Sequence, residues 1–246
     1  MGNVKLGVTL YCFTKEYCEG SMDLEDCIRT AKEMGAEGFE IVATQMVPSY
    51  PYISDAFLGE IRSICDCYDI EPVCYGANMD CGLRYDRRLT EDEMVERAIL
   101  DIRSANKMGC KVIRQQYLLS PNGLARIAPY AEAYGVKVGI EIHNPETPNS
   151  PAMMAYREAI EKSGSKYIGF VPDFGCFATK PNKPHWDEAL KNGADLRLLE
   201  MARDMRYDAV PMEEAQKRLK ENGATTLELA LLQEMYAFLQ FKKDCK

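Results

Sequence analysis

The stretch VKVGIEIHN, residues 136–144, predicts a strand with two different faces. Side chains alternate along a strand, so one face carries three aliphatic residues, Val138, Ile140 and Ile142. The opposite face carries Gly139, Glu141 and His143 and becomes polar toward the carboxyl end. A strand of an open, doubly wound sheet would be apolar on both faces. The pattern therefore favours the wall of a β/α barrel, whose functional residues gather at the carboxyl ends of the strands.

A second stretch, YIGFVPDFG at residues 167–175, repeats this alternation. Ile168 and Phe170 share one face, and the other face carries Gly169, Val171 and Asp173. No GxGxxG or Walker motif supports a nucleotide-binding sheet as the alternative. We therefore predict an α/β fold of the TIM-barrel type.

Short apolar runs and amphipathic helices alternate through the first two-thirds of the chain. The predicted strands are 5–13, 38–42, 72–79, 111–117, 136–144 and 167–175. The predicted helices between them lie near 21–35, 55–69, 90–109, 121–134 and 150–164. Thr90 and Glu93 are spaced as a capping box, and Gly109 is placed to end that helix. Six βα units at a spacing of roughly 30 residues are typical of a parallel sheet with helical crossovers.

The C-terminal part of the sequence does not continue this alternation. From residue 186 onward the pattern is helical, apart from the short run YDAV at 207–210. We predict a single domain over 1–246, with βα units in 4–185 and a helical tail in 186–246. A standard barrel has eight strands, so units seven and eight are predicted to be missing. Because proteins normally cover open sheet edges, either the chain is an incomplete piece, or its tail or another subunit shields the gap.

Composition excludes several classes of function. The 246-residue chain has a net charge of −8 and no basic block, so we expect a small-molecule ligand and no nucleic acid. It has neither an apolar run of about 18 residues nor a signal-peptide pattern, so we expect no membrane span. Ten scattered cysteines without a CxxC pair indicate reduced thiols and a cytoplasmic location.

Glu141, His143 and Asp173 come at the predicted carboxyl ends of neighbouring strands. Two carboxylates that converge there repel each other unless they are protonated or bridged by a cation. Oxygen-rich sites suit Mn²⁺ or Mg²⁺ better than zinc, and we expect Mn²⁺, with Mg²⁺ or Co²⁺ as alternatives. Such a cation would polarise a sugar carbonyl, while His143 exchanges a proton with the substrate near neutral pH.

Each of these three residues also has a purely structural interpretation. Glu141 could pair with a lysine inside the barrel, Lys137 or Lys111 for example. Asp173 could cap a following helix, and His143 could bind a loop carbonyl. The spacing alone leaves both interpretations open.

Five further residues are weaker candidates. Asn78, Arg114 and Gln116 lie at predicted strand ends and can hydrogen-bond sugar hydroxyls, and Arg114 offers a donor fork for a phosphate or carboxylate. Tyr11 could form an apolar wall against a sugar face. His185, in a proline-flanked segment, is a weak candidate for a third metal ligand. The alternative for all five is packing within the barrel mouth or the adjoining loops.

Four segments resemble the xylose-isomerase-like TIM-barrel superfamily of sugar isomerases, epimerases and related enzymes. They are GVTLYCFT (7–14), YGANMD (75–80), GIEIHNP (139–145) and GFVPDFG (169–175). The resemblance implies that Glu141 and Asp173 bind a divalent metal. The superfamily completes its metal site with a histidine from strand seven and a glutamate from strand eight, and this sequence has neither at a recognisable position.

The segment EIHNP, with a histidine two residues after the glutamate, is most similar to the catalytic alpha subunits of carbon-glycoside deglycosidases. These are lyases that act on 3-oxo-glycosides with a small partner subunit, and the resemblance makes His143 the acid–base residue. Three hypotheses follow. The first is a metal-dependent sugar isomerase or epimerase, the second is such a lyase, and the third is an inactive fragment or a non-catalytic subunit of a hetero-oligomer. In each case we expect an oligomer.

Overall fold

The computed structural model describes residues 5–79, 81–116, 118–143, 146–178 and 181–238. The chain divides into two compact units. The sheet-bearing unit comprises Met1–Glu141 and Pro151–Val171, and the helical unit comprises Ile142–Ser150 and Pro172–Lys246. Two units stand where the sequence predicts a single domain, because the C-terminal helices bury a core of their own.

The sheet has six strands that lie in the order of the sequence. They are β1 (Gly7–Thr9), β2 (Gly38–Val42), β3 (Glu71–Ala77), β4 (Val112–Gln115), β5 (Lys137–Ile142) and β6 (Ile168–Pro172). From β1 to β5 each strand pairs in parallel with the next. This order is that of a barrel wall, and the described strands do not close into a complete barrel.

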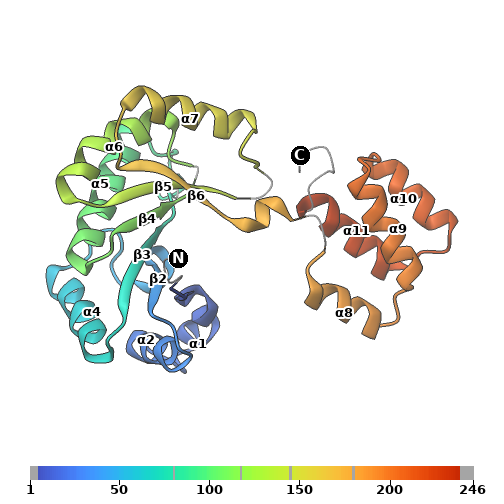
Figure 1. The fold of residues 1–246 in the computed structure, drawn as a ribbon, viewed down its shortest axis with the longest axis horizontal. Helices are drawn as coiled ribbons and strands as arrows, with labels where there is room; N and C mark the ends of the chain where they lie inside the picture. Colours follow the sequence, from blue (N-terminus) through green and yellow to red (C-terminus); the bar gives the residue numbers. More distant parts are fainter. Residues whose placement is uncertain (1–4, 80, 117, 144–145, 179–180, 239–246) are drawn as a thin grey trace. The chain divides into compact units, whose positions relative to one another are not determined.

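Helices follow the strands as predicted. They are α1 (Thr14–Cys18), α2 (Leu24–Glu33), α3 (Ala43–Met46), α4 (Asp55–Tyr68), α5 (Glu91–Met108), α6 (Pro121–Tyr134) and α7 (Pro151–Ser163). Helices α4 to α7 succeed one another along the outer face of the sheet (Figure 1). The predicted strand 5–13 is shorter in the structure, because a 3₁₀ helix, η1 (Leu10–Phe13), begins after the cap residue Thr9.

The local sequence determines where α5 begins and where it ends. The backbone N–H of Glu93 donates to Oγ1 of Thr90 at 3.3 Å, and the backbone N–H of Thr90 donates to Oε2 of Glu93 at 2.8 Å. Gly109 ends the helix with a φ of 97°, in the left-handed region that glycine adopts without strain. Both the predicted capping box and the predicted stop are confirmed.

The two faces predicted for β5 are also confirmed. Val138 and Ile140 are 1% and 0% exposed and belong to the core. Gly139 faces the other way, since a Cβ atom there would lie 2.6 Å from Cγ2 of Val171 on β6. Arg114 on β4 aligns with Gly139, so its side chain lies on the same inner face.

The helical unit consists of η2 (Phe174–Phe177), α8 (Lys183–Lys191), α9 (Leu196–Tyr207), α10 (Met212–Glu221) and α11 (Thr226–Phe238). Its buried core is formed by Ala194, Leu198, Leu199, Ala202, Met205, Ala215, Leu219, Leu231, Leu232 and Met235. The run YDAV is not a strand, because Tyr207 ends α9 and Ala209 turns the chain with a φ of 61°. The predicted helical character of this part is confirmed.

Glu228 on α11 is a buried carboxylate that joins two helix beginnings in this unit. It is 1% exposed and accepts hydrogen bonds from the backbone N–H groups of Asp195 at 2.7 Å and Thr225 at 2.8 Å. Burial by itself would raise the pKa of Glu228. The hydrogen bonds from Thr225 and Asp195 outweigh burial and hold this pKa below its ordinary value.

Replacing Glu228 by alanine is expected to lower the free energy of unfolding by about 1–3 kcal/mol at pH 7, because two buried N–H groups lose their acceptor. A carboxyl whose pKa is lowered by folding stabilises the protein above its unfolded pKa, and the effect disappears as the pH falls through the folded pKa. The difference between wild type and variant should therefore shrink below the ordinary value of 4.5. Urea unfolding at several pH values measures it, with the exposed Glu221→Ala as control. An equal loss in both variants would contradict this role.

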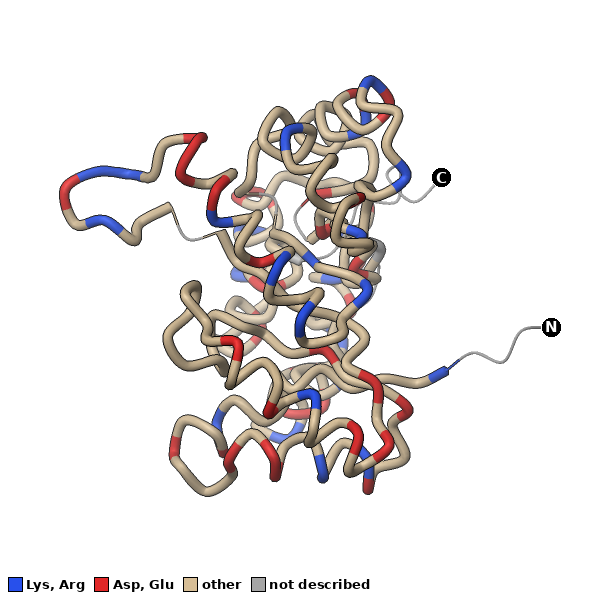
Figure 2. Tube along the Cα trace, turned by 90° about the vertical axis from the view of Figure 1, so that its left-hand side faces the viewer, with Lys and Arg blue, Asp and Glu red and all other residues tan. Residues whose placement is uncertain are grey.

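In the part of the chain that the structure describes, no helix is long and apolar enough to cross a membrane. Acidic and basic residues are interspersed along the trace (Figure 2).

Candidate active site

Arg114 of β4 joins two carboxylates across the inner face of the sheet. Its Nε donates to Oε1 of Glu40 on β2 at 2.6 Å, and its Nη1 donates to Oε2 of Glu141 on β5 at 2.7 Å. The side chains of Arg114, Glu40 and Glu141 are 18%, 17% and 9% exposed, so solvent screens these charges little. Burial by itself would lower the pKa of Arg114, and the two carboxylates outweigh burial and raise it.

The backbone of β3 leaves room for this cluster. A Cβ atom on Gly76 would lie 3.1 Å from Nη2 of Arg114 and 3.3 Å from Oε1 of Glu40. Cys74 lies on the same strand, with its Sγ 3.6 Å from Oε1 of Glu40. Burial, and then the charge of Glu40, raise the pKa of Cys74 to about 12. The thiol therefore remains protonated at neutral pH and is a donor to the carboxylate, not a nucleophile.

The partner of Glu141 is an arginine, where the structural interpretation of the sequence suggested Lys137 or Lys111. Arg114 directs its guanidinium at two carboxylates of the chain itself, so its expected role toward a substrate anion stays a prediction. Glu40 was missed by sequence reasoning. Its only signal was a charged residue inside the apolar run GFEIV, on the same face as Gly38.

His143 and Asp173 follow β5 and β6 and lie close together. Nε2 of His143 is 3.9 Å from Oδ2 of Asp173, and the two side chains are 48% and 37% exposed. Oδ1 of Asp173 accepts a hydrogen bond from the N–H of Gly175 at 2.8 Å, which confirms the interpretation of Asp173 as the cap of a following helix, η2. A half-exposed histidine beside a carboxylate can exchange protons with a ligand.

The donor set for a metal is incomplete among the described residues. No three side chains of the types His, Cys, Asp or Glu come together there in a group able to hold a metal ion. Glu141 faces the guanidinium of Arg114, and one oxygen of Asp173 serves as a helix cap. Carboxylate oxygens suit Mn²⁺ and Mg²⁺, but the described residues do not supply a full set of them. The metal role of Glu141 and Asp173 stays a prediction.

His185 lies on a helix, where the sequence suggested a loop. Pro184 stands at the first turn of α8, and the Nδ1 atom of His185 is 2.7 Å from Oε1 of Glu234 on α11. A hydrogen bond with Glu234, and then its charge, raise the pKa of His185. The structure therefore gives this histidine a carboxylate partner between two helices, and its role as a third metal ligand stays a prediction.

Three more candidates lie near strand ends, where the sequence placed Asn78 and Gln116. Asn78 follows β3, and its buried Oδ1 atom has no hydrogen-bond partner among the described residues. Gln116 follows β4 and donates its backbone N–H to the carbonyl of Ala77 at 3.2 Å. Tyr11, in η1 after β1, is 57% exposed. These positions suit contact with a ligand, and their substrate-binding role stays a prediction.

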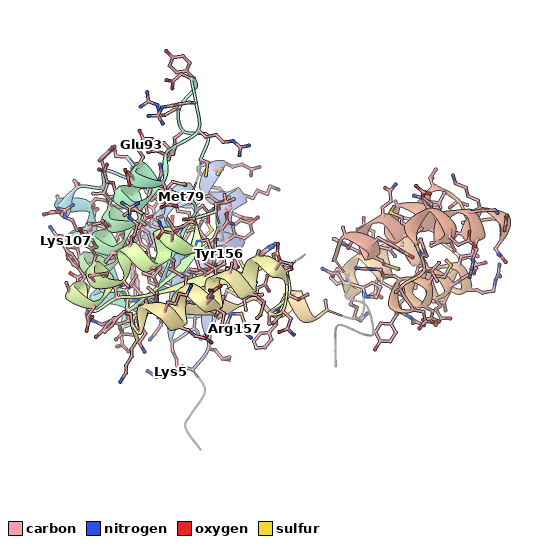
Figure 3. All side chains as sticks on the ribbon, turned by 90° about the horizontal axis from the view of Figure 1, so that it is seen from above. Lys5, Met79, Glu93, Lys107, Tyr156 and Arg157 are labelled. Atoms are coloured by element: carbon pink, nitrogen blue, oxygen red, sulfur yellow. The ribbon has the colours of Figure 1, made fainter. Side chains whose placement is uncertain are left out.

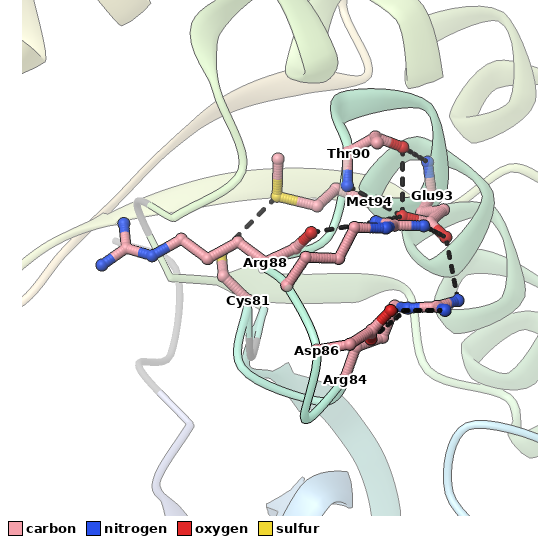
Figure 4. A network of polar contacts seen from close by, with 8 residues as sticks. Cys81, Arg84, Asp86, Arg88, Thr90, Glu93 and Met94 are labelled. Atoms are coloured by element: carbon pink, nitrogen blue, oxygen red, sulfur yellow. Dashed lines mark hydrogen bonds and ion pairs between the residues drawn. The ribbon is translucent and has the colours of Figure 1, made fainter.

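The segment 81–89 between β3 and α5 projects from the sheet-bearing unit, between the labelled residues Met79 and Glu93 (Figure 3). Arg87 donates to both oxygens of Glu93, at 2.7 and 2.8 Å. Figure 4 shows the same carboxylate bonded to Thr90. The bonds from Arg87, and then from Thr90, lower the pKa of Glu93 to about 2. The segment is therefore tied to α5 at its base, at the end of the sheet where βα loops build a site.

A cavity of about 480 Å³ opens on the inner face beside β1 to β3. Glu40 and Cys74 line it, together with Thr9 and Glu71. The Glu40–Arg114 pair therefore borders open space on the inner side of the sheet and is not sealed within the core.

The sequence profile described as xylose isomerase-like TIM barrel matches residues 28–203. The 3'-dehydrocarminate deglycosidase alpha subunit of a Microbacterium species is 37% identical, over 72% of this chain and 51% of that protein. The C-glycoside deglycosidase alpha subunit of Microbacterium trichothecenolyticum is 35% identical, over 72% and 48%. A C-glycoside deglycosidase alpha subunit from Arthrobacter globiformis is 31% identical, over 89% of this chain and 62% of that protein. The chain thus spans about half the length of the first two relatives and somewhat more of the third.

Solved structures show the same fold at low identity. D-psicose 3-epimerase, crystallised in the presence of D-fructose, has a TM-score of 0.54 at 16% identity and covers 70% of this chain and 64% of its own. The 3-keto-D-glucoside 4-epimerase YcjR from E. coli has a TM-score of 0.53 at 14% identity and covers 91% and 89%. The chain belongs to the xylose isomerase-like TIM barrel family, on the branch represented by the C-glycoside deglycosidase alpha subunits.

Proposed function

We propose that the chain carries the proton-transfer residues of a lyase that cleaves 3-oxo-C-glycosides. The observation that supports the proposal is the position of His143 beside Asp173 at the strand ends. His143 stands two residues after Glu141 in the sequence. The relatives named as alpha subunits of C-glycoside deglycosidases favour the same class of substrate. The isomerase or epimerase that the sequence first suggested is supported by the fold that the chain shares with epimerase structures.

The chemistry needs one base and one acid. A carbonyl at C3 of the sugar makes the hydrogen on C2 acidic, because the charge left by its removal spreads onto the carbonyl oxygen. We assign His143 as the base that takes this proton. The electron pair then forms a C1–C2 double bond while the bond from C1 to the aglycone breaks, and the aglycone carbon takes up a proton from the protonated His143 or from water. Asp173 lies beside this ring, with its Oδ2 atom 3.9 Å from Nε2 of His143.

Epimerisation is the second candidate, since it shares this first step. The side chain of His143 is 48% exposed, and this supports epimerisation as a candidate, because a base open to water can lose and regain protons readily. If a proton returns to the opposite face of the carbon before any bond to the aglycone breaks, the product is an epimer.

Incubation with a 3-oxo-C-glucoside, with the chain alone and with a small partner subunit, tests the proposal. The relatives are named as alpha subunits, so we expect cleavage to require the partner. Release of the aglycone supports a lyase, and an epimerised sugar without release supports the second candidate. If neither product forms with the partner present, the chain is the non-catalytic subunit or fragment of the third hypothesis.

Manganese is a separate part of the proposal. We expect Mn²⁺ to bind through Glu141 and Asp173, and calorimetric titration of the wild type against Glu141→Ala and Asp173→Ala measures this. Unchanged affinity in both variants would remove these residues from any metal site.

A further inference from the structure

The cluster of Glu40, Arg114 and Glu141 holds two negative charges and one positive charge. Arg114 donates Nε to Glu40 and Nη1 to Glu141, and these atoms belong to different edges of the guanidinium. Nη2 belongs to both edges, and it lies over Gly76, 3.1 Å from where a Cβ atom would be. Arginine usually grips a carboxylate with a whole edge, through two parallel hydrogen bonds. Here the competition between two carboxylates leaves each with one bond from Arg114.

This division has a consequence for Glu141. Its Oε2 atom accepts from Arg114, and Oε1 takes no part in that contact. If Glu40 lost its charge, Nε would keep only a neutral and weaker acceptor, and the edge formed by Nη1 and Nη2 could close on both oxygens of Glu141. Because these side chains are 9–18% exposed, water would compete weakly with such a closed pair.

We infer that Glu40 is a positioning residue for Glu141 and acts through Arg114. The bond from Nε to Glu40 fixes the guanidinium so that it bonds to only one oxygen of Glu141. The other oxygen can then bind a ligand at the strand ends. Glu40 touches neither Glu141 nor, in this assignment, the substrate. The inference rests on the proposed function only in treating Glu141 as part of the ligand site.

The test compares Glu40→Gln with the double variant Glu40→Gln/Arg114→Lys. Glutamine keeps the shape of the side chain and loses the charge, and we expect turnover to fall about 10- to 100-fold, the usual effect of removing an outer-sphere partner. Lysine keeps the positive charge but lacks the planar fork that makes two parallel hydrogen bonds to a carboxylate, and we expect the double variant to recover much of the activity. Glu71→Gln, which removes an exposed carboxylate from the same cavity wall, is the control and should keep wild-type turnover.

NMR of ¹⁵N-arginine-labelled protein supplies a readout that does not depend on turnover. In Glu40→Gln we expect the Nη–H signals of Arg114 to become protected from solvent exchange, and Glu141→Gln should reverse this. If the wild type cleaves no substrate while the signals behave in this way, the proposed function fails and the positioning role stands. If the signals do not change in Glu40→Gln, or if the lysine double variant is no more active than Glu40→Gln, the positioning role is overturned.

Discussion

Replacing Arg114 by methionine is expected to lower the free energy of unfolding of the sheet-bearing unit by about 3–5 kcal/mol. The substitution keeps much of the side-chain volume and removes the only positive charge that the structure places on Glu40 and Glu141, within the described residues. Two poorly exposed carboxylates would then face each other across the sheet without a cation, and breaking a buried pair in this way costs far more than losing a surface pair. Urea unfolding followed by circular dichroism measures the loss.

Arg126→Met is the matched control. Arg126 also contacts two carboxylates, Glu91 and Asp92, but its side chain is 39% exposed and solvent screens the pairs. We expect a much smaller change in the free energy of unfolding than for Arg114→Met, because exposed ion pairs contribute little. Similar losses for the two arginine variants would mean that the Arg114 cluster is no more than a surface ion-pair network.

Replacing His143 by glutamine is expected to lower the turnover of a 3-oxo-glycoside by about 10²- to 10⁴-fold, the usual contribution of a general acid–base group. Glutamine keeps a hydrogen-bonding side chain near Asp173 but cannot take up a proton at neutral pH. Steady-state kinetics on the chain with its partner subunit measures the effect, and we expect it in kcat more than in KM.

The second histidine of the chain provides the control for this substitution. His185 pairs with Glu234 between α8 and α11, so His185→Gln should leave turnover unchanged. A loss of activity in His185→Gln that matches the loss in His143→Gln would support the assignment of His185 to the site. Wild-type turnover in His143→Gln would remove His143 as the base.

The strand–helix order could be predicted from sequence because its signals are local. The capping box of Thr90 and Glu93, the stop at Gly109 and the alternation of β5 each depend on residues within one element, and all were confirmed. The termini of β2 and α6 agree with the predicted ranges as well. Periodicity alone also identified the strand ends at which Glu141 and Asp173 occur.

The charge partners could not be predicted, because they depend on contacts between distant parts of the chain. Glu40 and Arg114 are 74 residues apart, and only the strand register places both on the inner face beside Gly76. The spacing of polar residues indicated that Glu141 needed a partner but did not decide between a lysine and a metal, and it did not point to Arg114. The division into two units was missed for a similar reason, because helical periodicity shows that α8 to α11 have apolar faces but not that these faces pack on one another.

Hydrogen exchange at the substrate carbon tests the central claim most directly, since both the lyase and the epimerase begin by removing a proton next to a carbonyl. The chain, with its partner subunit, is incubated in D₂O with a 3-oxo-glucoside, and proton NMR follows the C2 and C4 positions. We expect deuterium at C2, lost in His143→Gln and retained in His185→Gln. Bond cleavage without any exchange or transfer of that hydrogen, or exchange that is equally fast in His143→Gln, would contradict it.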